Sequence, residues 1–143
     1  MFQDRNIQLL KKFFNDVDNA TKTVADLAPY FADGYKDFDR SPLSPPDLSD
    51  KDAHLAFFGA LKSGFRDFSH MINLLEPTKG GRYLVYWTFQ GRHVGDFFGV
   101  PATDRQARTN GIDIYTVQND KFIEQRHCED VAGLTAQLTA PSA

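Results

Sequence analysis

The chain has 143 residues, of which 41% are hydrophobic and 13% aromatic, and its formal net charge is −3. This length fits one domain, residues 1–143, with a core that needs no disulfide or structural metal. The 16 basic and 19 acidic residues are mixed along the sequence, so the charge pattern of a nucleic-acid-binding protein is missing.

Membrane attachment and export are equally unsupported by the sequence. No apolar run approaches the ~20 residues of a spanning helix, and the N-terminal stretch MFQDRNIQ lacks the charged-then-apolar layout of a signal peptide. Cys128 is the single cysteine and cannot form an internal disulfide, which agrees with a reducing compartment. We therefore expect a cytoplasmic protein with neither nucleic-acid nor membrane partners.

Apolar residues at helical spacing predict three helices in the first half of the chain. They cover residues 4–17, residues 24–31 and a segment that begins near Ser49, which is followed three residues later by Asp as in a weak capping box. Between the second and third helices, residues 34–40 fit a short strand. Residues 41–49, SPLSPPDLS, contain three prolines and predict a stiff loop, which is a candidate lid.

Alternation of apolar and polar residues predicts four consecutive strands in the second half, over residues 68–76, 82–94, 106–117 and 121–128. The final stretch DVAGLTAQL predicts a helical turn. Helices followed by consecutive strands indicate an α+β fold, in which an antiparallel meander curls around helices packed on one face. Such a curled sheet can leave a cavity at its open end.

The stretch EQRHCED, residues 124–130, contains four types of metal ligand in consecutive positions. Adjacent residues of a strand point to opposite faces, so His127 and Cys128 cannot converge on one ion. No second His/Cys pair lies at a spacing that would complete a site. The strand geometry therefore argues against a metal.

Asp113 and His127 form a more promising combination. If residues 118–120 make a three-residue hairpin loop, Asp113 pairs with Gln125 and His127 lies diagonal to Asp113 on the same face. An exposed cross-strand pair is worth only ~0.2–1 kcal/mol, whereas the same pair inside a cavity is suited to acid–base chemistry. The residues alone leave both interpretations open.

The predicted strand over residues 82–94 has rings on both faces, which fits a ring-lined pocket or a surface sealed by a partner subunit. One face carries Tyr83, Val85, Trp87, Phe89 and His93. His93 ends the strand, where it either caps the next turn or contacts a ligand. His54, on a helix among small and charged residues, and His70, in a strand between apolar residues, have less to recommend them as functional residues.

A family pattern runs through the last part of the chain, in GRHVGDFFGVPATDR, GIDIYTVQNDKFIEQRH and DVAGLTAQL. It comprises Gly91, His93, Gly95, Phe97, Phe98, Gly99, Pro101 and Thr103, then Asp130, Gly133, Leu134, Gln137 and Leu138. This pattern resembles the SnoaL-like polyketide cyclase family, while the N-terminal half matches only in layout. Asp120 stands where the family has a hairpin glycine, and Asp tolerates the left-handed conformation better than most residues.

The resemblance implies the cone-shaped fold of the nuclear transport factor 2-like superfamily, with an interior pocket lined by Asp113 and His127. In the best-understood cyclases, a carboxylate on the last strand takes the proton alpha to a carbonyl, and a histidine on the preceding strand assists, without a cofactor or metal. Alignment through Lys121 places His127 in the carboxylate position and Asp113 in the histidine position. The two partners are exchanged.

The sequence therefore predicts acid–base chemistry, either aldol-type cyclisation or isomerisation, on a small hydrophobic carbonyl compound. His127 is the expected base or acid, and Asp113 its orienting partner. The candidate substrate-binding residues are His93, Tyr115, Gln125, Trp87, Phe89 and Phe14. We expect a homodimer through the outer face of the sheet. The alternatives are a non-catalytic protein that binds a hydrophobic metabolite and a hydrolase or dehydratase of the same superfamily.

Overall fold

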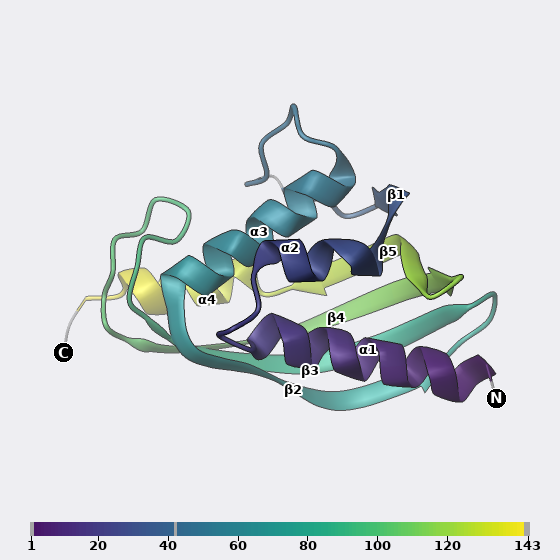
Figure 1. Cartoon of the computed structure of the whole chain (residues 1–143). Helices are drawn as coiled ribbons and strands as arrows, with labels where there is room; N and C mark the ends of the chain where they lie inside the picture. Colours follow the sequence, from purple (N-terminus) through teal and green to yellow (C-terminus); the bar gives the residue numbers. More distant parts are fainter. Residues whose placement is uncertain (1, 42, 142–143) are drawn as a thin grey trace.

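The computed structural model describes residues 2–41 and 43–141. The helical elements are α1 (Phe2–Asp18), α2 (Val24–Leu27), the 3-10 helix η1 (Ala28–Tyr30), α3 (Asp50–Gly64) and α4 (Val131–Thr139). The strands are β1 (Phe31–Asp37), β2 (Phe65–Pro77), β3 (Arg82–His93), β4 (Gln106–Gln118) and β5 (Lys121–Glu129). Helices α1, α2 and α3 cover one face of a curved sheet, and α4 packs against β4 (Figure 1).

The strands form one sheet in the order β1-β5-β4-β3-β2. The expected antiparallel meander is present over β2 to β5, but β1 pairs in parallel with β5, so the sheet is mixed. The helix predicted over residues 24–31 is shorter than expected. Pro29 lies at the start of η1 and has no backbone N–H for a longer α-helix, and Phe31 already begins β1.

Helix α3 begins where the sequence indicated. The Ser49 hydroxyl accepts a hydrogen bond from the backbone N–H of Asp52 at 3.1 Å, which satisfies one of the free donors of the first turn. The apolar stripe of α3 then faces the sheet, and Leu55, Phe58 and Leu61 are buried. Phe65, which extends this stripe in the sequence, instead opens β2.

The core is built from aromatic rings around Phe13 of α1, which is fully buried. Six rings lie edge to face with Phe13, with centroids 5.0 to 6.1 Å from that of Phe13: Phe14, Tyr30, Phe31, Phe58, Tyr115 and Phe122. Edge-to-face packing lets the positive ring edge meet the negative face of a neighbour. The phenylalanine-rich composition is thus used to fix the helices on the sheet.

The hairpin between β4 and β5 differs from the predicted one. Its loop has two residues, Asn119 and Asp120, whose φ angles of 53° and 60° suit the tight turns that join twisted strands. A bulge follows, because Val117 pairs with Phe122 while Thr116 pairs with Glu124. The predicted pairing of Asp113 with Gln125 is therefore wrong, and Asp113 lies directly opposite His127.

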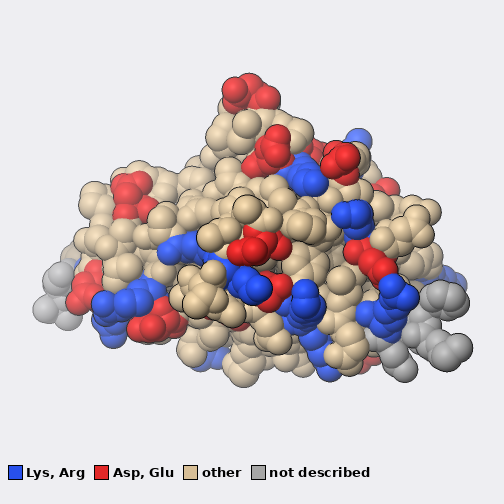
Figure 2. Space-filling model, viewed as in Figure 1, with Lys and Arg blue, Asp and Glu red and all other residues tan. Residues whose placement is uncertain are grey.

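On the surface, basic and acidic side chains are interspersed over the face shown in Figure 2. Within residues 2–41 and 43–141, no helix combines the length and apolar character needed to cross a membrane. The outer face of the sheet exposes large apolar side chains, including Met71, Leu74 and Ile112.

Candidate active site

A cavity of about 60 Å³, partly open to solvent, lies between the helices and the inner face of the sheet. Its wall includes all but one of the residues proposed from the sequence: Phe14, Trp87, Phe89, Asp113, Tyr115, Gln125 and His127. Most of the exposed wall is apolar, and its phenylalanine, tyrosine and tryptophan rings come from α1, α3, β3, β4 and the loop between β3 and β4. The polar groups are concentrated on β4 and β5.

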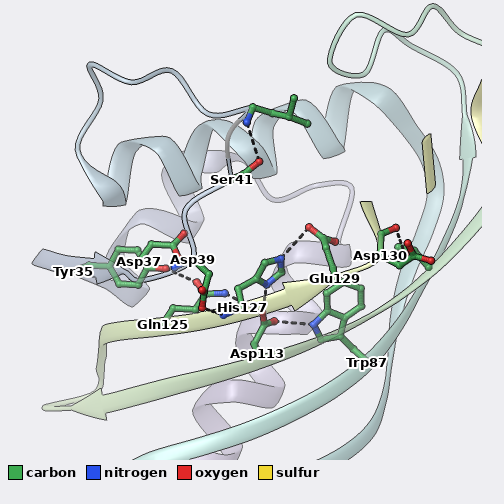
Figure 3. Close-up of polar contacts among 12 residues, drawn as sticks. Tyr35, Asp37, Asp39, Ser41, Trp87, Asp113, Gln125, His127, Glu129 and Asp130 are labelled. Atoms are coloured by element: carbon green, nitrogen blue, oxygen red, sulfur yellow. Dashed lines mark hydrogen bonds and ion pairs between the residues drawn. The ribbon is translucent and has the colours of Figure 1, made fainter. Parts of the chain in front are cut away.

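His127 lies between two carboxylates (Figure 3). Its Nδ1 is hydrogen-bonded to Asp113, and its Nε2 is 3.0 Å from Glu129 Oε1. Strand alternation explains the arrangement, since residues 127 and 129 of β5 share a face and residue 113 of β4 is the cross-strand partner of residue 127. The side chains are 5%, 22% and 13% exposed for Asp113, His127 and Glu129, respectively.

The protonation of this chain follows from its hydrogen bonds. Burial alone would lower the pKa of His127, but the hydrogen bonds and negative charges of Asp113 and Glu129 raise it to about 11. Burial opposes ionisation of Asp113, but the hydrogen bond and charge of His127 hold its pKa below the usual value. His127 is then an imidazolium near neutral pH, with both N–H groups engaged by carboxylates.

Asp113 is further fixed by two neutral donors. Trp87 Nε1 donates to its Oδ2 at 2.7 Å, and Gln125 Nε2 donates to its Oδ1 at 3.0 Å. Gln125 in turn accepts a hydrogen bond from the Tyr35 hydroxyl, which also fixes its amide orientation. With three partners, Asp113 serves as an anchor for its neighbours rather than as a group free to bind a substrate.

Trp87 reaches Asp113 because the facing position on β4 has no side chain. Gly111 pairs with Trp87, and a Cβ built on Gly111 would lie 2.1 Å from the indole ring. The indole also stacks on the His127 ring, with centroids 6.4 Å apart. Gly111 therefore provides the space in which the tryptophan crosses β4.

Tyr115 keeps a free hydroxyl at the cavity. Its ring is buried against Phe13, Phe14 and Phe122, and burial raises the pKa of its phenol well above 10. No residue in the described part of the chain makes a hydrogen bond with this hydroxyl. A neutral phenol in such a place is available as a hydrogen-bond donor.

His93 is the predicted site residue that does not line the cavity. It is fully buried, and its Nδ1 accepts hydrogen bonds from Thr103, with Nδ1 lying 3.0 Å from the hydroxyl and 3.3 Å from the backbone nitrogen. Its ring lies 5.4 Å from that of Phe65. His93 therefore fixes the loop after β3, so a hydrogen bond from it to a substrate is not supported.

Three titratable residues of the cavity wall were not among the site residues proposed from the sequence: Glu129, His54 and His70. Glu129 had a readable signal, because it lies two residues after His127 and so shares its face of a strand. The His54 ring packs against Phe31 and Tyr35 of β1 and Phe58 of α3. Burial lowers the pKa of His54 to about 4, an effect that the Asp113 charge opposes and the His127 charge increases. Its Nε2 is buried without a partner among the described residues.

The proline-rich loop reaches the cavity through Ser41 and Leu43. The loop is tied to the structure by Arg40, whose guanidinium donates to the backbone oxygens of Leu48 and Pro45 and pairs with Asp50. Pro42 lies outside the described residues. Part of the candidate lid thus lines the cavity wall, and its role in closing the cavity stays a prediction.

A family model described as SnoaL-like polyketide cyclase matches residues 8–138. The chain belongs to this family. Among curated proteins, aklanonic acid methyl ester cyclase DnrD of Streptomyces peucetius is 28% identical over 96 residues, which covers 67% of this chain and 66%, just under two thirds, of the relative.

Solved structures share the fold. TsrD from Streptomyces laurentii superposes with a TM-score of 0.76 and 24% identity, covering 94% of each chain. A candidate SnoaL-like polyketide cyclase from Jannaschia sp. CCS1 superposes with a TM-score of 0.78 and 18% sequence identity, covering 97% of this chain and 94% of the other. The α+β cone fold predicted from the resemblance is confirmed.

Proposed function

We propose that the protein catalyses cofactor-free acid–base chemistry, aldol-type cyclisation or isomerisation, on a small and largely apolar carbonyl compound. The observation that carries this proposal is the Asp113–His127–Glu129 chain in the wall of a ring-lined cavity. Acid–base catalysis needs a proton acceptor within reach of the substrate and a group that fixes its orientation and charge. The chain of three residues offers both.

Within this chain we assign the proton acceptor to Glu129. Asp113 already receives three hydrogen bonds, and both nitrogens of His127 are engaged. Glu129 lines the cavity and has one hydrogen bond from His127, which leaves carboxylate lone pairs free. The role of proton acceptor, which the sequence assigned to His127, thus moves to Glu129, two residues further along β5. His127 is the positively charged residue that positions Glu129.

The aklanonic acid methyl ester cyclase name of the relative is consistent with a cyclisation. A carboxylate, which removes a proton next to a carbonyl, suits this reaction class. The apolar rings of the wall suit a compound with few polar groups.

Proton exchange at carbon tests the proposal without the natural substrate. We would incubate the protein with 2-tetralone, a compact apolar ketone, in D₂O and follow loss of the alpha protons by NMR. Fluorescence of Trp87, the single tryptophan, reports binding in the same samples. We expect exchange above the buffer rate, and a loss of at least ~100-fold in Glu129→Gln. Saturable binding without exchange would contradict catalysis and support the alternative, a non-catalytic binding protein.

We also propose a homodimer through the outer face of the sheet. Leu74, Tyr86 and Ile112 are register partners across β2, β3 and β4, and two of them are more than 40% exposed. A contiguous apolar row of this kind is typical of a subunit interface. Sedimentation equilibrium of wild type and Ile112→Glu measures the oligomeric state. We expect a dimer for wild type and a monomer for the variant. A monomeric wild type would contradict the proposal.

A further inference from the structure

A second imidazole–carboxylate pair lies at the same cavity. His70 of β2 places its Nδ1 at 2.7 Å from Asp18 Oδ1, and its backbone N–H donates to Asp18 Oδ2 at 2.8 Å. The side chains are only 7% and 19% exposed, respectively. Because an ionised carboxylate is an acceptor only, Nδ1 carries the proton of this hydrogen bond. Any hydrogen bond of the ring to a bound molecule therefore involves Nε2.

The surroundings of His70 place it among the aromatic walls. Its ring centroid lies 5.6 Å from Phe14, 5.1 Å from Trp87 and 5.3 Å from Phe89. All four residues line the cavity. Nε2 of His70 has no hydrogen-bond partner within the described ranges. An oriented imidazole with one unengaged nitrogen at a cavity is the arrangement of a catalytic acid or base.

The position of Asp18 is fixed independently of His70. Asp18 ends α1, and the Lys62 ammonium of α3 donates to the backbone oxygens of Val17 at 2.7 Å and Asn19 at 3.1 Å. A cation at these carbonyls stabilises the C-terminal end of the helix. Phe14 lies one turn before Asp18, so the same face of α1 supplies a ring wall and the carboxylate.

The order of the strands separates the two polar clusters. Trp87 lies on β3, His70 lies on the neighbouring β2, and Glu129 lies on β5 on the other side of β3. Trp87 contacts His70 with its ring edge-to-face and stacks on His127. A compound lying on the Trp87 side of the cavity is thus flanked by a carboxylate and by an imidazole.

We propose that His70 is a second catalytic residue, which donates a proton from Nε2 to the carbonyl oxygen of the bound compound, and that Asp18 is its positioning residue. This proposal rests on the proposed function. Glu129 takes the proton of the carbon next to the carbonyl, and the C–H electron pair forms a C=C bond. The electron pair of the C=O π bond moves to the oxygen, which takes the Nε2 proton of the His70 imidazolium.

The products of this step are an enol, protonated Glu129 and neutral His70, so the total charge is unchanged. Asp18 stabilises the positive charge of the ring in the reactant state, and the enol hydroxyl returns the proton to Nε2 when the step reverses. The substrate class that fits is an enolisable ketone with an apolar body, whose acidic C–H faces β5 and whose oxygen faces β2. Acid catalysis at the oxygen lowers the barrier for removing the carbon-bound proton.

The 2-tetralone exchange assay tests this role with His70→Asn and Asp18→Asn. Asparagine at position 70 retains a donor near the Nδ1 position but has no atom at Nε2. We expect His70→Asn to lose at least ~10-fold in exchange rate while 2-tetralone still quenches Trp87. For Asp18→Asn we expect a shifted pH–rate profile and, in ¹⁵N NMR of the His70 ring, loss of the Nδ1-protonated form. Asp33→Asn, at a fully exposed carboxylate, is the matched control.

The outcomes separate the two proposals. Exchange by wild type that is abolished in Glu129→Gln but unchanged in His70→Asn would overturn the role of His70 and leave the proposed function standing. Binding of 2-tetralone without exchange by wild type would overturn both. A neutral His70 ring in wild type with its proton on Nε2 would also overturn the proposed orientation by Asp18.

Discussion

Two histidine–aspartate pairs flank β3, and they differ in what remains free on the imidazole. In the Asp113–His127 pair, the second ring nitrogen meets Glu129, and the aspartate has two further donors. In the Asp18–His70 pair, the second ring nitrogen has no partner in the described part of the chain. The same two residue types thus build a fixed pair, in which both ring nitrogens are engaged, and an available pair, in which one ring nitrogen can still bind a ligand. The surrounding hydrogen bonds decide the chemistry.

The largest expected effect comes from Asp113→Asn. The change removes the more buried of the two carboxylates that neutralise the His127 cation, so we expect a loss of about 3–5 kcal/mol in the free energy of unfolding. Asp18→Asn should cost only about 1–2 kcal/mol, since that carboxylate is more exposed and the amide still accepts one hydrogen bond. Urea denaturation measures both. Equal losses would contradict the distinction between a fixed and an available pair.

His127→Gln tests the fixed pair through the pH dependence of the free energy of unfolding. The folded-state pKa of His127 is raised to about 11 from an unfolded value near 6.5, so its stabilisation is fully present below pH ~6.5 and is lost as the pH rises toward 11. We expect wild type to exceed the variant by about 2–3 kcal/mol at pH 7, with the difference shrinking by pH 10. Arg126→Gln is the control, because arginine does not titrate in this range. A difference independent of pH would refute the imidazolium assignment.

Gly111→Ala tests the hydrogen bond by which Trp87 holds Asp113 in the fixed pair. The added methyl group would overlap the Trp87 indole, so we expect a loss of about 1–3 kcal/mol and a changed tryptophan emission as Trp87 leaves Asp113. Gly34→Ala provides a matched strand control, because nothing lies within 4 Å of a Cβ built there. Thermal unfolding and fluorescence spectra measure the effect. Identical spectra for the two variants would argue against a fixed indole.

Lys62→Met tests how the lysine at the end of α1 positions Asp18 of the available pair, and it has the smallest expected effect. Removing the ammonium frees the carbonyls at the end of α1, and we expect a loss of about 1 kcal/mol together with a shift of the His70 ring resonances in NMR. Lys11→Met, at an exposed position of α1, should leave those resonances unchanged. Unmoved His70 signals in Lys62→Met would show that Asp18 is positioned without the lysine.

Much of the layout was predictable because periodicity is a local property. The α1 stripe, the Ser49 cap and the strands β2 to β5 follow from neighbouring residues in the sequence. The parallel pairing of β1 with β5 could not be read in this way, since it joins segments that are far apart and carry no turn signal between them.

The site was predictable only in part, and for the same reason. Asp113 and His127 belong to one hairpin, so alternation together with the assumed three-residue loop put them on one face. His70 and Asp18 are 52 positions apart and meet only when α1 packs across β2. His54 lay on a helix with mixed neighbours, and only the packing of α3 on the sheet made it a cavity residue. Contacts between distant elements carry no short-range signature.

The bulge at Ile123 sets the chemical identity of the cavity wall. With the two-residue loop and no bulge, the register of Val117 with Phe122 would continue, and Asp113 would face Arg126. Gln125, His127 and Glu129 would then all turn outward. One inserted residue therefore decides which of the two alternating sets of β5 side chains faces the cavity. In this chain, a length change of a single residue in the hairpin would be enough to bring Arg126 in place of His127 to the cavity wall without altering the order of the strands.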